Sequence, residues 1–440
     1  MWPYHPELLA RPVPRYTSYP TAADFSGAVG PSDMAAALAC VGTGDALSLY
    51  VHIPFCHSIC WYCGCNTGAA NRAERLANYL AALMDEIALV AGRLNGRGRV
   101  RRIAYGGGSP NALTPAQFRA LHDSIAQAFH LDDPTISVEI DPRSLTREFV
   151  DAMQAIGTVQ ASLGVQTFSP HIQSLIGRVQ PIEMIERATQ WLREAGVRSL
   201  NFDLMYGLPA QQLDDLDSSI DHTARLGADR IAIFGYAHVP DLLPRQRRID
   251  ASALPDVDTR FAQAAHGHAR LAGLSYQPVG FDHFALPGDP MARAAREGRL
   301  HRNFQGFTDD DASILIGLGA SAISEFPGLL LQNEKNAGRY RMCTSAGRLA
   351  QMRGVRRCPA VRARGRIIER LLCDLAADLP PLEDWARIEQ RLTPFLDKGL
   401  ARLDGSRLII APDALPYARA IAACFDNFRD LGPGQFSNAI

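Results

Sequence analysis

The sequence predicts an α/β protein whose largest domain is a full or partial (β/α) barrel of the TIM type. Short apolar runs alternate with longer amphipathic segments between residues 46 and 325. This alternation, repeated about six or seven times, is typical of βαβ units that form a parallel sheet. Glycine-rich and polar motifs follow several of the runs, as expected where barrel strands end and a ligand binds. A doubly wound open sheet is the alternative.

The expected elements follow one another in a regular order along the chain. Apolar runs of strand length occur at Leu47–Ile53, Arg102–Tyr105, Ile136–Ile140, Val159–Val165, Ser199–Leu204, Ile231–Tyr236 and Tyr276–Phe281. Helical patterns occur at Glu74–Arg93, Pro115–His130, Ile182–Ala195, Leu213–Leu226 and Val257–Leu271, and beyond the barrel at Val361–Leu375 and Leu382–Leu396.

Two segments flank the predicted barrel. Residues 1–45 are rich in proline, tyrosine and threonine and carry one helical patch at Pro31–Val41, so we expect an ordered N-terminal arm. Residues 326–440 are mainly helical and include a hairpin-like piece at Leu400–Ile410. That piece is similar to the end of a winged-helix unit. Because the chain lacks charge directed at DNA, we interpret the region as a C-terminal lid domain.

The composition of the chain argues against several classes of function. The chain has 440 residues, is 47% hydrophobic and carries a net charge of −1, so electrostatics give no general case for nucleic acid or an anionic membrane. No apolar stretch is long enough to cross a bilayer, and the first residues lack the pattern of a signal peptide. Clustered thiols without a secretion signal fit the cytoplasm.

Four cysteines follow the first apolar run, with the spacing C-x3-C-x2-C-x-C. Cys56, Cys60 and Cys63 form a triplet that one loop can bring together, and Cys65 follows after one further residue. Three thiolates can hold a [4Fe–4S] cube and leave its fourth iron open, whereas ferredoxin motifs supply four. A structural zinc site or a redox dithiol is the competing interpretation, although such zinc sites normally need a second, distant pair of ligands, which this chain lacks.

A glycine-rich motif follows the second apolar run. Gly106, Gly107 and Gly108 lie between Tyr105 and the Ser109–Pro110 pair. Glycines let a ligand approach the backbone closely, although a tight turn explains them equally well. An open iron needs a ligand with an amino and a carboxylate group. A glycine-rich strand end beside the cysteine loop could bind that amino group through backbone carbonyls.

Cysteine triplet and glycine motif together resemble those of the radical SAM enzymes, and within them the oxygen-independent coproporphyrinogen III oxidases. The resemblance extends over nearly the whole chain, both termini included. It is carried by RYTSYPT (Arg15–Thr21), YVHIPFC, GGGSP, EIDPR, GVQTF, NFDLMYGLP, YAHVP, DHFALP, HRNFQGFT, GASAIS and CFDNF, in this order.

The resemblance implies a set of cofactor-binding residues. Cys56, Cys60 and Cys63 would hold a [4Fe–4S] cluster, and Cys65 would not be a ligand. A first S-adenosylmethionine would contact Tyr50, Tyr62, Gly106, Glu139 and Ile323, and a second would contact Gly107, Gly108 or its neighbour Ser109, Gln166, Arg178, Asp203 and Ala237.

Simpler structural roles remain open for several of these residues. Glu139 and Asp203 could cap helices, because carboxylates favour that position. Tyr62 could merely shield the cluster, Arg178 could be a solvated helix residue, and Gln166 could satisfy backbone groups.

The implied activity is an oxidative decarboxylation in heme biosynthesis. A 5′-deoxyadenosyl radical would remove a β-hydrogen from a propionate, and loss of CO2 and one electron would leave a vinyl group. Two such reactions convert coproporphyrinogen III to protoporphyrinogen IX. We expect a cytoplasmic monomer that binds a porphyrinogen and accepts electrons from a donor such as reduced flavodoxin, without nucleic acid or membrane. Arg15 and Arg302 are candidates for binding the substrate carboxylates.

Two other functions remain compatible with the sequence. A heme chaperone would share the barrel and the triplet but would form no product. A radical enzyme of the same superfamily acting on another tetrapyrrole, such as a heme-opening methyltransferase, would release a methylated or ring-opened product.

Overall fold

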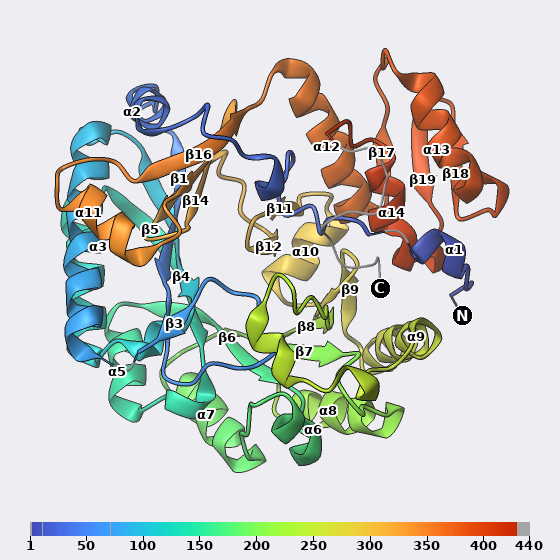
Figure 1. Cartoon of the computed structure of the whole chain (residues 1–440), viewed down its shortest axis with the longest axis horizontal. Coiled ribbons are helices and arrows are strands. Elements are labelled where there is room, and N and C mark those ends of the chain that lie inside the picture. Colours follow the sequence, from blue (N-terminus) through green and yellow to red (C-terminus); the bar gives the residue numbers. More distant parts are fainter. Residues whose placement is uncertain (1, 11, 71, 429–440) are drawn as a thin grey trace.

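Six parallel strands form the centre of the computed structural model, which describes residues 2–10, 12–70 and 72–428. They lie side by side in chain order and are β1 (Ala46–Ile53), β4 (Arg99–Gly107), β5 (Leu131–Ile140), β6 (Thr158–Gln166), β7 (Ser199–Tyr206) and β8 (Arg230–Gly235). Each pairs in parallel with the next. The strand order follows the chain without reversal, and α3, α5, α7 and α8 lie on the outer side of the strands (Figure 1). This is the arrangement of a singly wound barrel and not of a doubly wound sheet.

The barrel is partial, because its two edges carry antiparallel strands that do not pair with each other. The run at Tyr276–Phe281 contains only β9 (Gln277–Val279), which forms a hairpin with β10 (His283–Ala285). A connection this short cannot contain the helix that a parallel crossover needs. The seventh parallel strand is instead β13 (Ile314–Leu318), which pairs with the free side of β1.

Beyond β13 the sheet continues through three antiparallel strands. These are β14 (Ile323–Phe326), β15 (Leu329–Asn333) and β16 (Gln351–Arg356), with α11 (Ala337–Thr344) between the last two. The expected domain boundary at residue 325 therefore falls within β14. The division of the chain into arm, barrel and lid remains a proposal.

The outer helices arise from clear local signals. In α3 (Ala73–Leu94) the buried side chains recur at helical spacing along one face, and the helix ends where Asn95 adopts a left-handed φ of 50°. In α4 (Pro115–Ala128) Thr114 and Gln117 form a capping box. The other helices of this layer are α5 (Arg147–Ala155), α6 (Pro170–Leu175), α7 (Ile182–Glu194), α8 (Leu213–Arg225) and α9 (Val257–Gly273).

The first helix packs against the C-terminal elements beside the barrel. Leu8 and Leu9 of α1 (Pro6–Leu9) share an apolar core with the C-terminal helices. The C-terminal elements are α12 (Pro359–Asp374), β17 (Ala376–Asp378), α13 (Trp385–Asp397), β18 (Ala401–Asp404), β19 (Arg407–Ile410) and α14 (Ala418–Ala423).

Hydrogen bonds join the first and last sequence motifs. The Tyr16 hydroxyl donates to Asp426 Oδ2 at 3.0 Å, and the Tyr19 hydroxyl donates to Asn427 Oδ1 at 2.6 Å. The N-terminal arm is therefore fastened to the C-terminal region. Figure 1 shows α1 beside the C-terminal elements, whereas α2 (Pro31–Ala39), which the arm also carries, lies on the other side of the molecule near β16. No helix in the described part of the chain has the length and apolarity needed to cross a membrane.

Candidate active site

The cysteine loop extends from the carboxyl end of β1, as the barrel topology requires. Cys60 is buried and Cys56 and Cys63 are half-buried, and all three carry free thiols. The loop is anchored by the Trp61 N–H, which donates to the carbonyl of Ile176 at 3.1 Å, just after α6. Burial raises the pKa of Cys56 to about 12, and the nearby Cys63 and Cys60 add to this rise. The three thiols therefore lie within electrostatic range of one another.

This arrangement fits an iron–sulfur cluster better than zinc. In the described part of the chain, no three His, Cys, Asp or Glu side chains come together as ligands of a single metal ion, which the zinc alternative needs. A four-iron cube needs only a spaced triplet. Cys65 is exposed, and its backbone N–H donates to Cys63 Sγ at 3.4 Å, so it lies beside the triplet.

Two arginines converge on Cys60. Arg178 Nη1 lies 3.1 Å from Cys60 Sγ, and Arg143 Nη2 lies 3.2 Å from the same sulfur. Both also bond to Asp141, with Arg143 Nη2 at 2.6 Å from Oδ2 and Arg178 Nη2 at 3.4 Å from Oδ1. Burial alone would raise the pKa of Asp141, but Arg178 and Arg143 outweigh it and hold that pKa below its usual value. Positive charge beside three thiolates suits the negative charge that a thiolate-held cluster carries.

Glu139 and the glycine motif form a cradle next to this loop. The N–H of Gly107 donates to Glu139 Oε2 at 3.0 Å, and a Cβ on Gly106 would lie about 2.5 Å from the Glu139 carboxylate carbon. Gly107 has a φ of 104°, which favours glycine. Burial raises the pKa of Glu139 to about 7, and the nearby Asp203 adds to the rise. Such a carboxylate is suited to pair with a cationic group.

Asp203 and Gln166 extend the site to β6 and β7. Asp203 accepts hydrogen bonds from Ser162 at 3.0 Å and from Asn201 at 2.8 Å. Gln166 is buried in the left-handed region at a φ of 69°, a conformation that costs energy outside glycine and often marks a functional position. The Arg178 guanidinium reaches the same strand, because its Nε donates to the carbonyl of Gly164 at 3.1 Å.

A single amide connects Tyr62 to Ala237. Gln246 Nε2 donates to the carbonyls of both residues, at 3.0 Å each, and Gln246 is only 1% exposed. Gln246 belongs to a short 3-10 helix (Pro244–Arg248) in the loop after β8. It therefore links the cysteine loop to the end of β8.

Tyr50 and Ile323 lie on the opposite flank of the site. Both are buried and both pack against Phe304. The Tyr50 hydroxyl lies 3.1 Å from Nδ1 of His52, whose pKa burial lowers to about 4. His52 is thus a neutral side chain that supports Tyr50.

Gly106, Gly107, Glu139 and Gln166 lie at the carboxyl ends of β4, β5 and β6, and Ala237 follows β8. Tyr50 and Asp203 lie within β1 and β7, Arg178 lies in the loop after α6, and Ile323 begins β14. Arg178 bonds to both Cys60 and the strand that carries Gln166, and Gly106 lies against Glu139. Tyr50 and Ile323 belong to two small apolar clusters that share Phe304. Several contacting residues lie outside the expected set. These are Asp141, Arg143, Ser162, Asn201 and Gln246.

The two expected substrate arginines differ in their surroundings. Arg302 Nε and Nη2 donate to the carbonyls of Tyr16 and Arg15, at 3.0 and 2.8 Å, so most of this guanidinium holds the N-terminal arm. Arg15 Nη2 donates to the carbonyl of Gly235 at 3.1 Å, at the end of β8, and its guanidinium borders a cavity.

Comparison with known proteins adds independent findings. Residues 50–223 match the model of the radical SAM superfamily. The chain is 42% identical to an oxygen-independent coproporphyrinogen III oxidase of Bradyrhizobium diazoefficiens and 36% identical to that of Escherichia coli; each match covers 97% of this chain and at least 96% of the relative. The solved structure of coproporphyrinogen III oxidase from Escherichia coli, described as a radical SAM enzyme, superposes with a TM-score of 0.91 at 34% identity, over 97% of this chain and 100% of that one.

Proposed function

Since the chain belongs to the oxygen-independent coproporphyrinogen III oxidases, a family of radical SAM oxidoreductases that use a [4Fe–4S] cluster and S-adenosylmethionine, we propose how its carboxyl-edge residues perform this reaction. The enzyme converts two propionates of coproporphyrinogen III to vinyl groups. The observation that carries our assignment of roles is the convergence of Arg143 and Arg178 on Cys60, one loop away from the Glu139 cradle.

Cys56, Cys60 and Cys63 would hold the cluster, with Arg143 and Arg178 balancing its charge. When bound, the cluster and S-adenosylmethionine supply the 5′-deoxyadenosyl radical that removes hydrogen from the propionate. The protein orients the reactants and excludes water from this radical. Asp141 keeps both arginines in place, because its carboxylate bonds to each.

The Glu139 cradle would bind the amino group of a first S-adenosylmethionine. The carboxylate is already bonded to the N–H of Gly107, so its position is fixed before the ligand arrives. Tyr50, Tyr62 and Ile323 would form the less polar walls around the rest of the molecule. These side chains are wholly or largely buried, and we expect them to keep the site dry.

A second S-adenosylmethionine would bind along β6 and β7. Gln166 ends β6, Asp203 lies on the neighbouring β7, and Arg178 reaches β6 from the loop after α6. Together they supply a donor, an anion and a cation, which matches a zwitterionic ligand. Ala237, together with Gly107 and Gly108, would contribute backbone groups. The Gln246 amide supports this arrangement by holding the carbonyls of Ala237 and Tyr62.

The wider setting is also part of the proposal. The enzyme would work in the cytoplasm as a monomer, without nucleic acid or membrane, and would take electrons one at a time from a carrier such as reduced flavodoxin. The fastened N-terminal arm and C-terminal region would cover the mouth of the partial barrel and so protect the radical from solvent.

An anaerobic assay of cluster-reconstituted protein tests this function. Coproporphyrinogen III, S-adenosylmethionine and a reductant are supplied, and tetrapyrroles and 5′-deoxyadenosine are followed by mass spectrometry. We expect protoporphyrinogen IX with matching 5′-deoxyadenosine. Formation of 5′-deoxyadenosine with a methylated or ring-opened product would indicate another tetrapyrrole substrate, and heme binding without any product would indicate a chaperone.

A further inference from the structure

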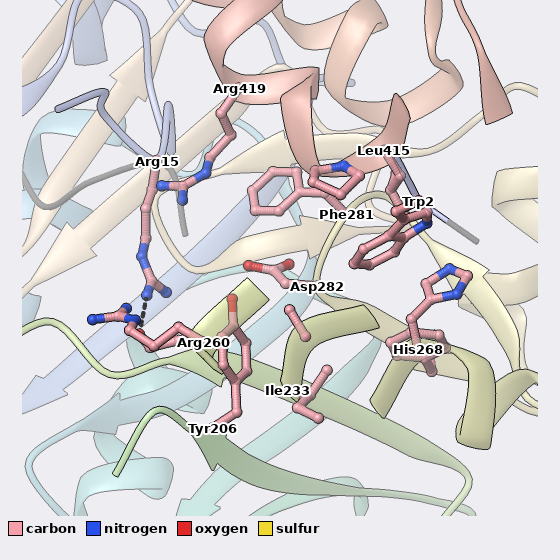
Figure 2. Close-up of a pocket in the computed structure, with 14 residues that line it drawn as sticks. Trp2, Arg15, Tyr206, Ile233, Arg260, His268, Phe281, Asp282, Leu415 and Arg419 are labelled. Carbon is pink, nitrogen blue, oxygen red and sulfur yellow. Dashed lines mark hydrogen bonds between the residues drawn. The ribbon is translucent and has the colours of Figure 1, made fainter. Parts of the chain in front are cut away.

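The cavity that Arg15 borders lies next to the cofactor-binding edge, where the barrel meets the N-terminal arm and the C-terminal region. Its volume is about 60 Å³, which accommodates a carboxylate but not a tetrapyrrole ring. Tyr206 and Gly235 end β7 and β8 on one side, and α9 contributes Arg260. Figure 2 shows Trp2 and Arg15 from the N-terminal arm and Leu415 and Arg419 from the C-terminal region on the other side.

The cavity is lined by more arginines than acids among the described residues. Arg15 and Arg260 line it together with Arg419, and Asp282 is the one acid in the described lining. Asp282 already has a partner, because its Oδ1 lies 2.7 Å from His283 Nδ1. In Figure 2 the guanidinium groups of Arg15, Arg260 and Arg419 lie on the same side of the cavity, and Asp282 and the hydroxyl of Tyr206 lie beside them.

This concentration of positive charge is unfavourable in the free protein. Burial, reinforced by Arg15, lowers the pKa of Arg419 to about 10 and also lowers that of Arg260. Within the described residues, Arg260 Nε is buried without a hydrogen-bond partner. Buried polar and charged groups in proteins are normally paired, so the unsatisfied Nε of Arg260 makes the cavity suited to an anion.

We propose that this cavity, the arginine pocket, binds a propionate carboxylate of the porphyrinogen on a side chain that is not being decarboxylated, through Arg15 and Arg260. The inference rests on the proposed function, because it takes its ligand from that reaction. Guanidinium groups bind carboxylates in a directed, often bidentate way. Phe281 and Phe284 in the lining supply an apolar surface for the adjoining hydrocarbon.

The place of the pocket in the fold supports a substrate carboxylate. Tyr206 lies three residues after Asp203 on β7, and Gly235 lies two residues before Ala237. The pocket therefore adjoins the site proposed for the second cofactor, and a tetrapyrrole held there would lie across the barrel mouth. Its carboxylate would also draw together an arginine from the N-terminal arm and one from the barrel.

Binding of coproporphyrin III, the stable oxidised form with four carboxylates, tests the proposal in full-length, cluster-reconstituted protein. Fluorescence titration compares wild type with Arg260→Gln and Arg15→Gln. The matched control is Arg119→Gln, an exposed arginine on α4. We expect the Kd to rise about 10-fold or more in both pocket variants and to stay unchanged in the control. The tetramethyl ester of coproporphyrin III, which has no charged carboxylates, should bind wild type and variants alike.

Further measurements separate the alternatives. An unchanged Kd in both folded pocket variants would overturn the proposal. A raised Kd for S-adenosylmethionine instead of coproporphyrin III would assign the carboxylate to the cofactor and would also overturn it. Loss of thermal stability in Arg260→Gln would point to a structural role. We expect this variant to be at least as stable as wild type, because repulsion between the arginines is relieved. Arg260→Lys should recover part of the affinity for coproporphyrin III. If wild type binds coproporphyrin III through Arg260 but forms no vinyl product, the proposal for the arginine pocket is supported and the proposed function is wrong. If vinyl product forms and the KM for coproporphyrinogen III is unchanged in the variants, the proposed function is supported and the proposal for the arginine pocket is wrong.

Discussion

Two groups of arginines lie at the mouth of this barrel, and they differ in how their charge is matched. Arg143 and Arg178 share the carboxylate of Asp141 and the sulfur of Cys60, so both guanidinium groups are bonded to partners within the protein. Arg15 and Arg260 lie in the arginine pocket, where the lining acid Asp282 is already bonded to His283. The first group resembles a completed network around a resident cofactor, and the second an incomplete network that a substrate completes.

The largest expected effect concerns the completed network. Cys60→Ala removes the sulfur on which both arginines converge, so reconstituted protein should lose its iron and sulfide, its visible absorbance and all activity above background. The control is Cys40→Ala, which removes an exposed thiol far from the loop and should retain the cluster. Full iron content in Cys60→Ala, or equal loss in Cys40→Ala, would contradict the assigned ligands.

The variant Arg178→Gln tests whether the two groups of arginines differ in how much they contribute to stability. Arg178→Gln leaves the buried Asp141 with one cation fewer, so we expect the free energy of unfolding of the cluster-free protein to fall by about 3 kcal/mol. Arg260→Gln should cause no such fall. Denaturant unfolding of the two variants and wild type provides the measurement. Equal destabilisation by both substitutions would remove the distinction between the networks.

The buried carboxyl group of Glu139, which we propose to pair with the amino group of S-adenosylmethionine, gives a pH prediction. Because the folded pKa of Glu139 is raised to about 7 by burial and by Asp203, its contribution to stability without ligand is present at low pH and is lost as pH rises from its ordinary value of 4.5 through 7. Pairing with the amino group of S-adenosylmethionine requires the ionised form. The affinity for S-adenosylmethionine should therefore increase up to about 10-fold between pH 6 and 8.

The matched variant for this pH profile is Glu139→Gln. It keeps the shape of the side chain but cannot ionise, so the pH dependence of S-adenosylmethionine binding should disappear and the affinity at pH 8 should fall. A profile that stays the same in the variant would assign the titration to another group, of which Asp203 is the nearest candidate.

The smallest expected effect concerns the attachment of the arm that carries Arg15. Tyr19→Phe removes the hydrogen bond to Asn427, which should reduce the free energy of unfolding by about 1 kcal/mol and weaken coproporphyrin III binding only slightly. Thermal unfolding and the same fluorescence titration measure both effects. Binding as weak as in Arg15→Gln would mean that closure of the arm, and not the arginine, governs affinity.

The central strands and the outer helices were predictable because their signals are local. Six apolar runs became β1 and β4–β8, since strands buried on both faces need continuous apolar sequence. The prediction that Tyr276–Phe281 forms a parallel barrel strand was wrong, because the chain turns back within a few residues to form the β9–β10 hairpin. The role of β13 depends on pairing with β1, more than 250 residues earlier, which no local pattern reports.

The residues of the candidate site likewise fall into those that the sequence could indicate and those that only the structure reveals. Cysteine spacing and the glycine motif indicated the cluster loop and its neighbour from sequence alone. Arg143 could have been suspected from its place in the EIDPR motif, two residues after Asp141. Gln246 carries no such signal, because its importance comes only from reaching two carbonyls on separate loops. Arg15 and Arg302 look equivalent in sequence, yet Arg302 mainly bonds to the backbone of the arm.

The most direct test of this account measures coproporphyrin III affinity and S-adenosylmethionine affinity in Arg178→Gln and Arg260→Gln side by side. We predict opposite effects: Arg178→Gln weakens S-adenosylmethionine binding and leaves coproporphyrin III nearly unchanged, whereas Arg260→Gln weakens coproporphyrin III about 10-fold or more and leaves S-adenosylmethionine unchanged. If both variants lose both ligands to the same extent, the two arginine groups form a single site and the distinction between them is wrong.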